Sequence, residues 1–284
     1  MALDKDTHIR LEKKAHELRH LCLDTVVWAG SGHVGGSLSA MDIMTVLYHK
    51  HLKINPSDPT DPERDRFILS KGHCGVGLAP VLADKGYFDR ELLKTYNHTG
   101  SKLGMHLDST KVPGVDASTG SLGHGLPIAL GITLATRVTQ KSYWTYCLIG
   151  DGECDEGVIW EAAMAISHYN VTELITIVDR NKCMMDGRTE DVMRLEPFAD
   201  KWRAFGFQVI EIDGNNILAI DEAICTAKNS KDKPTVIIAN TIKGCGVNFM
   251  EDNFRWHYGG LDADKLKEAK ESLDASHETR MRGL

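Results

Sequence analysis

The chain has 284 residues, a formal net charge of −7 and fractions of charged and apolar residues (26% and 42%) that are ordinary for a globular protein. An acidic chain with no basic stripe is not expected to bind nucleic acid, and no apolar stretch is long enough to predict a membrane span. The polar segment 1–14 is not typical of a secretory signal. Seven cysteines with no C-x-x-C pair favour reduced thiols and a cytoplasmic protein.

The predicted elements begin with helices and then alternate between strands and helices. In chain order, the apolar patterns predict helices at 9–28 and 39–50, a strand at 66–69, helices at 76–85, 89–96 and 126–139, a strand at 146–149, a helix at 156–170, a strand at 174–178, a helix at 198–204, a strand at 209–212, a helix at 217–229, a strand at 235–239 and a closing helix at 262–273. A glycine-rich break at 29–36 and a long irregular segment at 100–125 interrupt this series, and an irregular segment that long is usually functional.

This alternation predicts an α/β fold. Strands that are apolar throughout and separated by helices are typical of a parallel sheet covered on both faces. We therefore expect a doubly wound, mainly parallel sheet with helices on both faces. No linker marks a second domain, so residues 1–284 are expected to form a single domain with a C-terminal helical tail.

Polar motifs follow two neighbouring strands of the predicted sheet. Asp151 lies between Gly150 and Gly152 after one strand, and Asn181 follows the next strand. A strand–helix–strand crossover brings both residues to the same carboxyl edge of the sheet. Carboxylate and amide oxygens suit Mg²⁺ or Ca²⁺, and the glycines and helix start suit a phosphate. The alternative is an ordinary crossover unit with an aspartate helix cap and a turn asparagine.

A glycine motif near the N-terminus matches a dinucleotide-binding fingerprint by its letters. Gly30, Gly32 and Gly35 have the required spacing. That fingerprint requires a strand before it, whereas an amphipathic helix precedes it here. A nicotinamide-dependent dehydrogenase is therefore not favoured.

Several motifs together resemble the transketolase family of thiamine diphosphate enzymes, in the family's order and over roughly residues 8–275. The motifs are Ser31-Gly32-His33, the strand 67–69 that ends in Ser70-Lys71-Gly72-His73, Met105-His106, the segment 114–125, Gly150-Asp151-Gly152 with Asn181, and Trp256-His257-Tyr258-Gly259. The resemblance implies the diphosphate-binding (PP-type) domain of that family, with thiamine diphosphate and Mg²⁺, or Ca²⁺ or Mn²⁺, as cofactors.

The resemblance also assigns candidate binding residues. The implied metal ligands are Asp151, Asn181 and the backbone carbonyl of Cys183. The implied cofactor contacts are His73, Gly120, Ser121, Leu122, Gly150, Gly152, Glu153, Glu156, Asn181 and Lys243. Glu156 falls where the family has a glutamate that links the two active sites of its dimer. Glu153 replaces a small apolar residue and is interpreted mainly as a solvated glutamate at a helix start, although a contact with metal-bound water is an alternative. Lys243 is interpreted either as a phosphate contact or as a surface lysine.

Four of the thirteen histidines are candidates for catalysis. Transketolases move a two-carbon ketol unit between sugar phosphates, and neutral imidazoles suit the required proton transfers. By resemblance, His33 and His257 would handle protons at the donor's oxygens, while His73 and His106 would hydrogen-bond the bound substrate and intermediate. The role of His124 stays open, and the others are expected to be surface or structural residues: His8, His16, His20, His49, His51, His98, His168 and His277.

The resemblance covers only half of a complete transketolase, so a partner is expected. A separate pyrimidine-domain subunit would supply the missing half, with two copies of each chain in a heterotetramer that acts on sugar phosphates or related sugars. The alternatives are a subunit of another thiamine diphosphate enzyme, such as a 2-oxoacid dehydrogenase or a deoxyxylulose-phosphate synthase, and a non-catalytic cofactor-binding module.

Overall fold

The computed structural model describes residues 3–284, and its centre is a five-stranded sheet. The strands are β1 (Arg66–Leu69), β2 (Thr145–Gly150), β3 (Leu174–Arg180), β4 (Gln208–Asp213) and β5 (Thr235–Asn240). Every neighbouring pair is parallel, in the order β1-β2-β3-β5-β4. All five strands lie where the apolar runs predicted them, and the α/β fold with a parallel sheet is confirmed.

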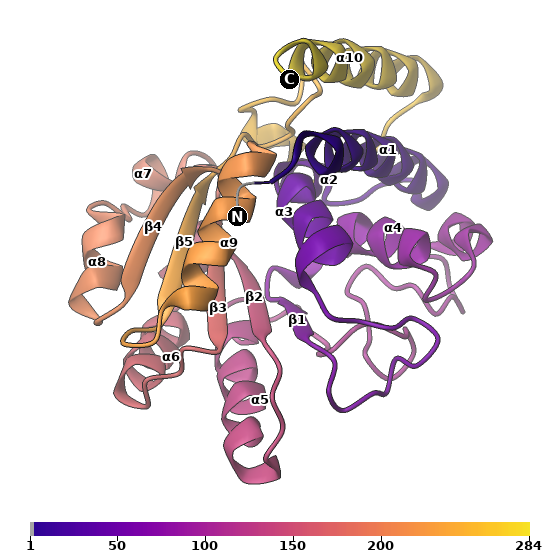
Figure 1. Cartoon of the computed structure of the whole chain (residues 1–284). Coiled ribbons are helices and arrows are strands. Elements are labelled where there is room, and N and C mark those ends of the chain that lie inside the picture. The colour runs from indigo at the N-terminus through magenta and orange to yellow at the C-terminus, as the bar shows by residue number, and fades with distance from the viewer. Residues whose placement is uncertain (1–2) are drawn as a thin grey trace.

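Helices cover both faces of the sheet (Figure 1). Side chains alternate along each strand, so Tyr146 and Leu148 of β2 contribute to one core while Cys147 and Ile149 contribute to the other. The first core lies under the helices α1 (Lys5–Ala29), α3 (Met41–Val46), α4 (Gly75–Lys85) and α9 (Ile217–Asn229). The second lies under α5 (Gly125–Thr139), α6 (Gly157–His168) and α8 (Phe198–Ala204).

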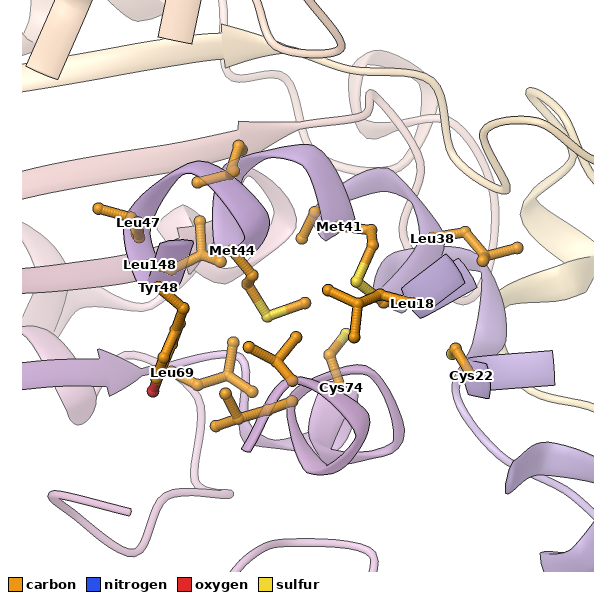
Figure 2. Close-up of a cluster of buried hydrophobic side chains, with 14 of the residues drawn as sticks. Leu18, Cys22, Leu38, Met41, Met44, Leu47, Tyr48, Leu69, Cys74 and Leu148 are labelled. Atoms are coloured by element: carbon orange, nitrogen blue, oxygen red, sulfur yellow. The ribbon is translucent and has the colours of Figure 1, made fainter. Parts of the chain in front are cut away.

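The first core reaches from the sheet to the N-terminal helices (Figure 2). Leu69 and Leu148 of the sheet pack toward Met44, and Leu18 of α1 packs beside Cys74. These side chains are at most 5% exposed. This apolar packing fixes the position of the chain segments that leave β1 and α1 toward the site.

Most predicted helices are present, and the differences have local causes. The glycine-rich break contains a short buried helix, α2 (Val34–Ser39), and the predicted helix 39–50 divides into α3 and a π-helical turn (Leu47–His51). Gly35 and Gly36 allow α2 to pack closely, because a Cβ on Gly35 would lie 2.6 Å from the carbonyl oxygen of Trp256. The glycines that predicted a break therefore serve close packing instead.

Other segments differ only in their type or extent. Residues Arg90–Thr95 form a 3₁₀ turn instead of an α-helix, and further short turns lie at Gly72–Cys74, Gly152–Asp155 and Phe254–His257. A one-turn helix, α7 (Thr189–Val192), follows β3. The closing helix, α10 (Ala263–Arg282), is longer than predicted and lies against α1 (Figure 1). Within the described residues, no helix has the length and apolar character that crossing a membrane would require.

Candidate functional site

A cavity of about 340 Å³ opens at the carboxyl ends of β1, β2 and β3. Parallel α/β sheets bind ligands at this edge. The predicted site residues that line the cavity are His33, His73, Gly120, Leu122, Gly150, Asp151, Gly152, Glu153, Asn181, Cys183, Lys243 and His257. Segments that are more than 200 residues apart in the chain thus meet at one site.

Asp151 and Asn181 end neighbouring strands, as the crossover predicted. Asp151 is 2% exposed, and its two carboxylate oxygens accept the backbone N–H groups of Gly152 (2.9 Å) and Lys182 (2.7 Å). The Asn181 side-chain oxygen accepts the N–H of Cys183 at 3.1 Å. Burial, and then the nearby charge of Asp179, raise the pKa of Asp151 to about 6.

This donor set fits a hard divalent cation. The ion pairs of the described residues give Asp151 no cationic side chain, and its high pKa reports a buried charge that lacks compensation. Carboxylate, amide and carbonyl oxygens are the ligands that Mg²⁺ and Ca²⁺ prefer. A cation held by Asp151, Asn181 and the Cys183 carbonyl would supply the missing positive charge.

Lys243 lies inside the cavity wall and not on the surface. It is 1% exposed, and its Nζ donates to the Cys183 carbonyl at 3.1 Å. The same Nζ lies 3.1 Å from Nδ1 of His257. Burial, and then the charge of Lys71, lower the pKa of Lys243. The interpretation of Lys243 as a surface lysine is therefore wrong, and its position favours a contact with an anionic group in the cavity.

A buried ion pair between Lys71 and Asp179 was not predicted. Lys71 Nζ donates to Asp179 and to the carbonyl of Gly36 (3.0 Å). Asp179 also accepts the hydroxyls of Ser39 (2.7 Å) and Thr241. Burial opposes the charge on each partner, but their attraction raises the pKa of Lys71 and lowers that of Asp179. One sequence feature could have indicated this ion pair, namely a charged residue at the end of each of two apolar strands.

Glu153 is also buried. Its carboxylate accepts the Ser70 hydroxyl and the backbone N–H groups of Gly123 (2.7 Å) and Gly150 (2.9 Å). The side chain ties the strand ends of β1 and β2 to the loop before α5, and burial raises its pKa. Its interpretation as a solvated helix-start glutamate is therefore wrong, although it does line the cavity.

Three of the four candidate histidines form a triangle at the cavity. The ring centroids of His33 and His73 are 4.9 Å apart, and that of His257 lies 5.4 Å and 5.3 Å from them. Burial lowers the pKa of His33 and His73 to about 4, and burial together with Lys243 lowers that of His257 to about 2. All three rings are therefore neutral at physiological pH. Among residues 3–284, Nδ1 of His33 is buried and has no hydrogen-bond partner.

The remaining predicted residues lie outside the cavity lining. His106 is exposed, and its ring contacts the position where Gly120 would carry a Cβ, at 3.1 Å. Burial, and then His73, lower the pKa of His106. Ser121 and Glu156 are exposed, and Glu156 is the residue before α6. The cavity lining also includes residues that sequence reasoning missed, namely Gly36, Lys71, Met184, Met185 and Asp186.

Comparison with known proteins gives one family. The family described as "Transketolase, thiamine diphosphate binding domain" matches residues 11–281. The 6-deoxy-6-sulfo-D-fructose transketolase subunit SqwG of a Clostridium species is 44% identical over 269 residues, which are 95% of this chain and 98% of that protein. One of the subunits of the apulose-4-phosphate transketolase of Phocaeicola vulgatus is 39% identical over 91% of this chain and 92% of its own length.

Solved structures agree with these relatives. The transketolase of Campylobacter jejuni superposes with a TM-score of 0.87 and 32% identity over 95% of this chain. A complex of the Pichia stipitis transketolase with sedoheptulose 7-phosphate superposes with a TM-score of 0.86 and 29% identity over 96% of this chain. In both cases this chain spans 45% of the longer protein.

Proposed function

Because this chain belongs to the transketolase family and corresponds to its thiamine diphosphate-binding part, we propose that it is the N-terminal subunit of a two-subunit transketolase. In this proposal it transfers a two-carbon ketol unit from a ketose to an aldose acceptor, together with a separate pyrimidine-domain subunit. The matched subunits have nearly the same length as this chain, whereas the solved single-chain transketolases are more than twice as long. These relatives favour a transketolase subunit over a subunit of a 2-oxoacid dehydrogenase or a deoxyxylulose-phosphate synthase.

The observation that carries this proposal is the convergence of two sets of groups on one cavity. Asp151 and Asn181 provide oxygen ligands on one side, while His33, His73 and His257 provide neutral imidazoles on the other. Hard-metal ligands alone would suit many phosphate-binding proteins. Their combination with neutral proton-transfer groups suits carbon–carbon bond chemistry on a cofactor anchored by its diphosphate.

We place the diphosphate and its cation, most simply Mg²⁺, beside Asp151, Asn181 and the Cys183 carbonyl. The Lys243 ammonium faces the same cavity and would offset further negative charge. When bound, thiamine diphosphate supplies the electron sink for cleavage of the ketose.

The proposal assigns different roles to the histidines. His33 and His257, whose rings are neutral, would handle protons at the hydroxyl oxygens of the donor. Lys243 would donate to Nδ1 of His257, so Nε2 of that neutral ring carries the proton and would donate it to a substrate oxygen and later take it back. His73 and the more exposed His106 would hydrogen-bond the bound sugar. A positioned acid or base of this kind contributes about 10²–10⁴ in rate.

The partner subunit would dock over the mouth of the cavity. Exposed apolar side chains gather after β3, where Met185 lines the cavity and Val192 and Met193 lie on the following segment. Exposed apolar surface beside a functional cavity is typical of an interaction site. A stoichiometry of two copies of each chain, with Glu156 at the contact between the two sites, is part of the proposal. The free cysteines suit a cytoplasmic location.

A reconstitution experiment tests this function. The chain is mixed with a pyrimidine-domain transketolase subunit from the same organism, thiamine diphosphate and Mg²⁺, and ketol transfer is followed from pentose, branched and sulfonated sugar donors. We expect activity in the mixture, almost none from the chain alone, and none with Asp151→Asn. Turnover of pyruvate but not of sugars would show a different thiamine diphosphate enzyme, and cofactor binding without turnover of any of these compounds would show a non-catalytic cofactor-binding module.

A further inference from the structure

A second group of metal-ligating side chains lies outside the cavity, between α1 and α10. His16 and His20 are one turn apart on α1, and Asp274 lies on α10. Nε2 of His16 is 3.1 Å and Nε2 of His20 is 2.9 Å from the same Asp274 carboxylate oxygen. Both helices therefore contribute to one compact cluster, and they lie side by side in Figure 1.

The spacing of these three atoms suits a transition-metal ion. All three potential ligand atoms lie within 4.8 Å of one another. Zinc bonds to imidazole and carboxylate are about 2.0–2.2 Å long, which in a tetrahedral site separates the ligand atoms by roughly 3.3 Å. We propose that His16, His20 and Asp274 bind a zinc-type divalent cation that ties α10 to α1.

The charges around the cluster permit this binding. The neighbouring Arg19 and Arg280 are both paired with the buried carboxylate of Asp42. On binding, each imidazole would carry its proton on Nδ1 and direct the Nε2 lone pair to the cation.

A candidate fourth ligand lies beside His16. A small cavity of about 20 Å³, lined by His16 and His277, lies beside it and has room for one water molecule. The His277 ring stacks on the His16 ring with a centroid distance of 4.2 Å. Either this water or the His277 ring after a change of rotamer would complete four-coordination.

His16, His20 and His277 were interpreted from the sequence as surface or structural histidines, because no sequence spacing joins residues 16 and 274.

The proposed cation would matter because α10 has little apolar support. Only Ala269 and Leu273 of its twenty residues are buried. The helix nevertheless braces the loop that follows Lys243, since the Ser272 hydroxyl donates to the Gly246 carbonyl (3.0 Å) and accepts the N–H of Asn248 (2.9 Å). A metal link to α1 would therefore stabilise both α10 and this loop.

Zinc titration of the full-length chain, prepared without a histidine tag, tests the proposal. The titration is followed by calorimetry in excess Mg²⁺, which competes with Zn²⁺ for the Asp151 site. We expect one equivalent of Zn²⁺ to bind, and a rise in Tm with Zn²⁺ concentration because the cluster is assembled only in the folded chain. His16→Ala/His20→Ala should weaken this binding by about 100-fold or more and remove the rise in Tm.

Three further variants distinguish zinc held between α1 and α10 from zinc held elsewhere on the chain. Asp274→Asn, an exposed and conservative change, should also weaken Zn²⁺ binding, which guards against misfolding of the double variant. His168→Ala on α6 is the matched histidine control, and Asp151→Asn removes the proposed cavity site. Both variants should still bind one equivalent of Zn²⁺. Binding that is unchanged in the α1 and α10 variants, or that is lost in Asp151→Asn, would overturn the proposal.

Discussion

Lys71 and Asp179 form a buried ion pair at the edge of the cavity, whereas the neighbouring Asp151 has no cationic ion-pair partner in the part of the chain that the structure describes. Lys71 is 2% exposed and Asp179 is fully buried. Two carboxylates at adjacent strand ends thus have different environments, because one is neutralised by the protein and the other faces the cavity. This difference explains how the same sheet edge combines a rigid structural contact with a candidate cation site.

Lys71→Met should destabilise the chain strongly. Removal of one partner leaves the Asp179 charge buried and uncompensated, which costs about 3–5 kcal/mol. The free energy of unfolding in urea measures the loss. Lys71→Met combined with Asp179→Asn should recover much of it, and Lys267→Met on the exposed face of α10 is the matched control. A cost below about 1 kcal/mol for the single variant would contradict the role given to this pair.

The binding of Mg²⁺ and thiamine diphosphate should weaken as the pH falls through about 6. The reason is that protonation of Asp151 competes with the cation, and its pKa is raised to about 6 in the unliganded chain. Calorimetric titration at a series of pH values measures this dependence. Asp151→Asn should abolish the binding, whereas Asp155→Asn, an exposed change on the next turn, should leave it intact. Affinity that does not change across this range would argue against Asp151 as a ligand.

Glu153→Ala should lower the free energy of unfolding by about 3 kcal/mol or more. The change leaves one hydroxyl and two backbone N–H groups without their acceptor, and each buried donor without a partner costs about 1–3 kcal/mol. Glu153→Gln keeps one oxygen and should cost less. Urea unfolding gives both values, with Asp155→Ala as the control in the same turn. Equal and small effects of Glu153→Ala and Asp155→Ala would restore the interpretation of Glu153 as a solvated residue.

The neutral histidines should make the unliganded chain sensitive to acid. The pKa of His33 is about 4 in the folded chain against an ordinary value of 6.5, so the unfolded chain binds more protons between these limits. This contribution to stability is fully present above about 6.5 and is lost as the pH falls toward about 4. In His33→Gln, the decrease in the free energy of unfolding across this pH range should be smaller by an amount on the order of 2 kcal/mol. Urea unfolding at a series of pH values measures it. The exposed His168→Gln should follow the parent chain, and a His33→Gln curve identical to it would refute this role of His33.

Much of the site follows from short sequence patterns. The apolar runs before Asp151 and Asn181 locate the strand ends, and the rule for parallel crossovers brings these two residues together without reference to coordinates. The glycines beside His33 and His73 mark loops at the same edge. For these residues, local sequence and chain topology are sufficient, because each lies directly after an element whose position the sheet fixes.

Other features depend on contacts between distant segments. The burial of Lys243 and Glu153 follows from the packing of the 243–250 loop and of the loop before α5 over the strand ends, which no local pattern contains. The glycines of α2 predict a break by propensity, yet packing against residue 256 makes them part of a buried helix.

The sequence by itself determined the α/β class, the strand positions and the candidate cation ligands at the strand tips. Only the tertiary structure decided which charges are paired, which histidines meet, and that α1 and α10 bring His16, His20 and Asp274 together. The physical reason is that periodicity encodes the local conformation and the buried face of each element, whereas charge pairing depends on through-space distances between side chains.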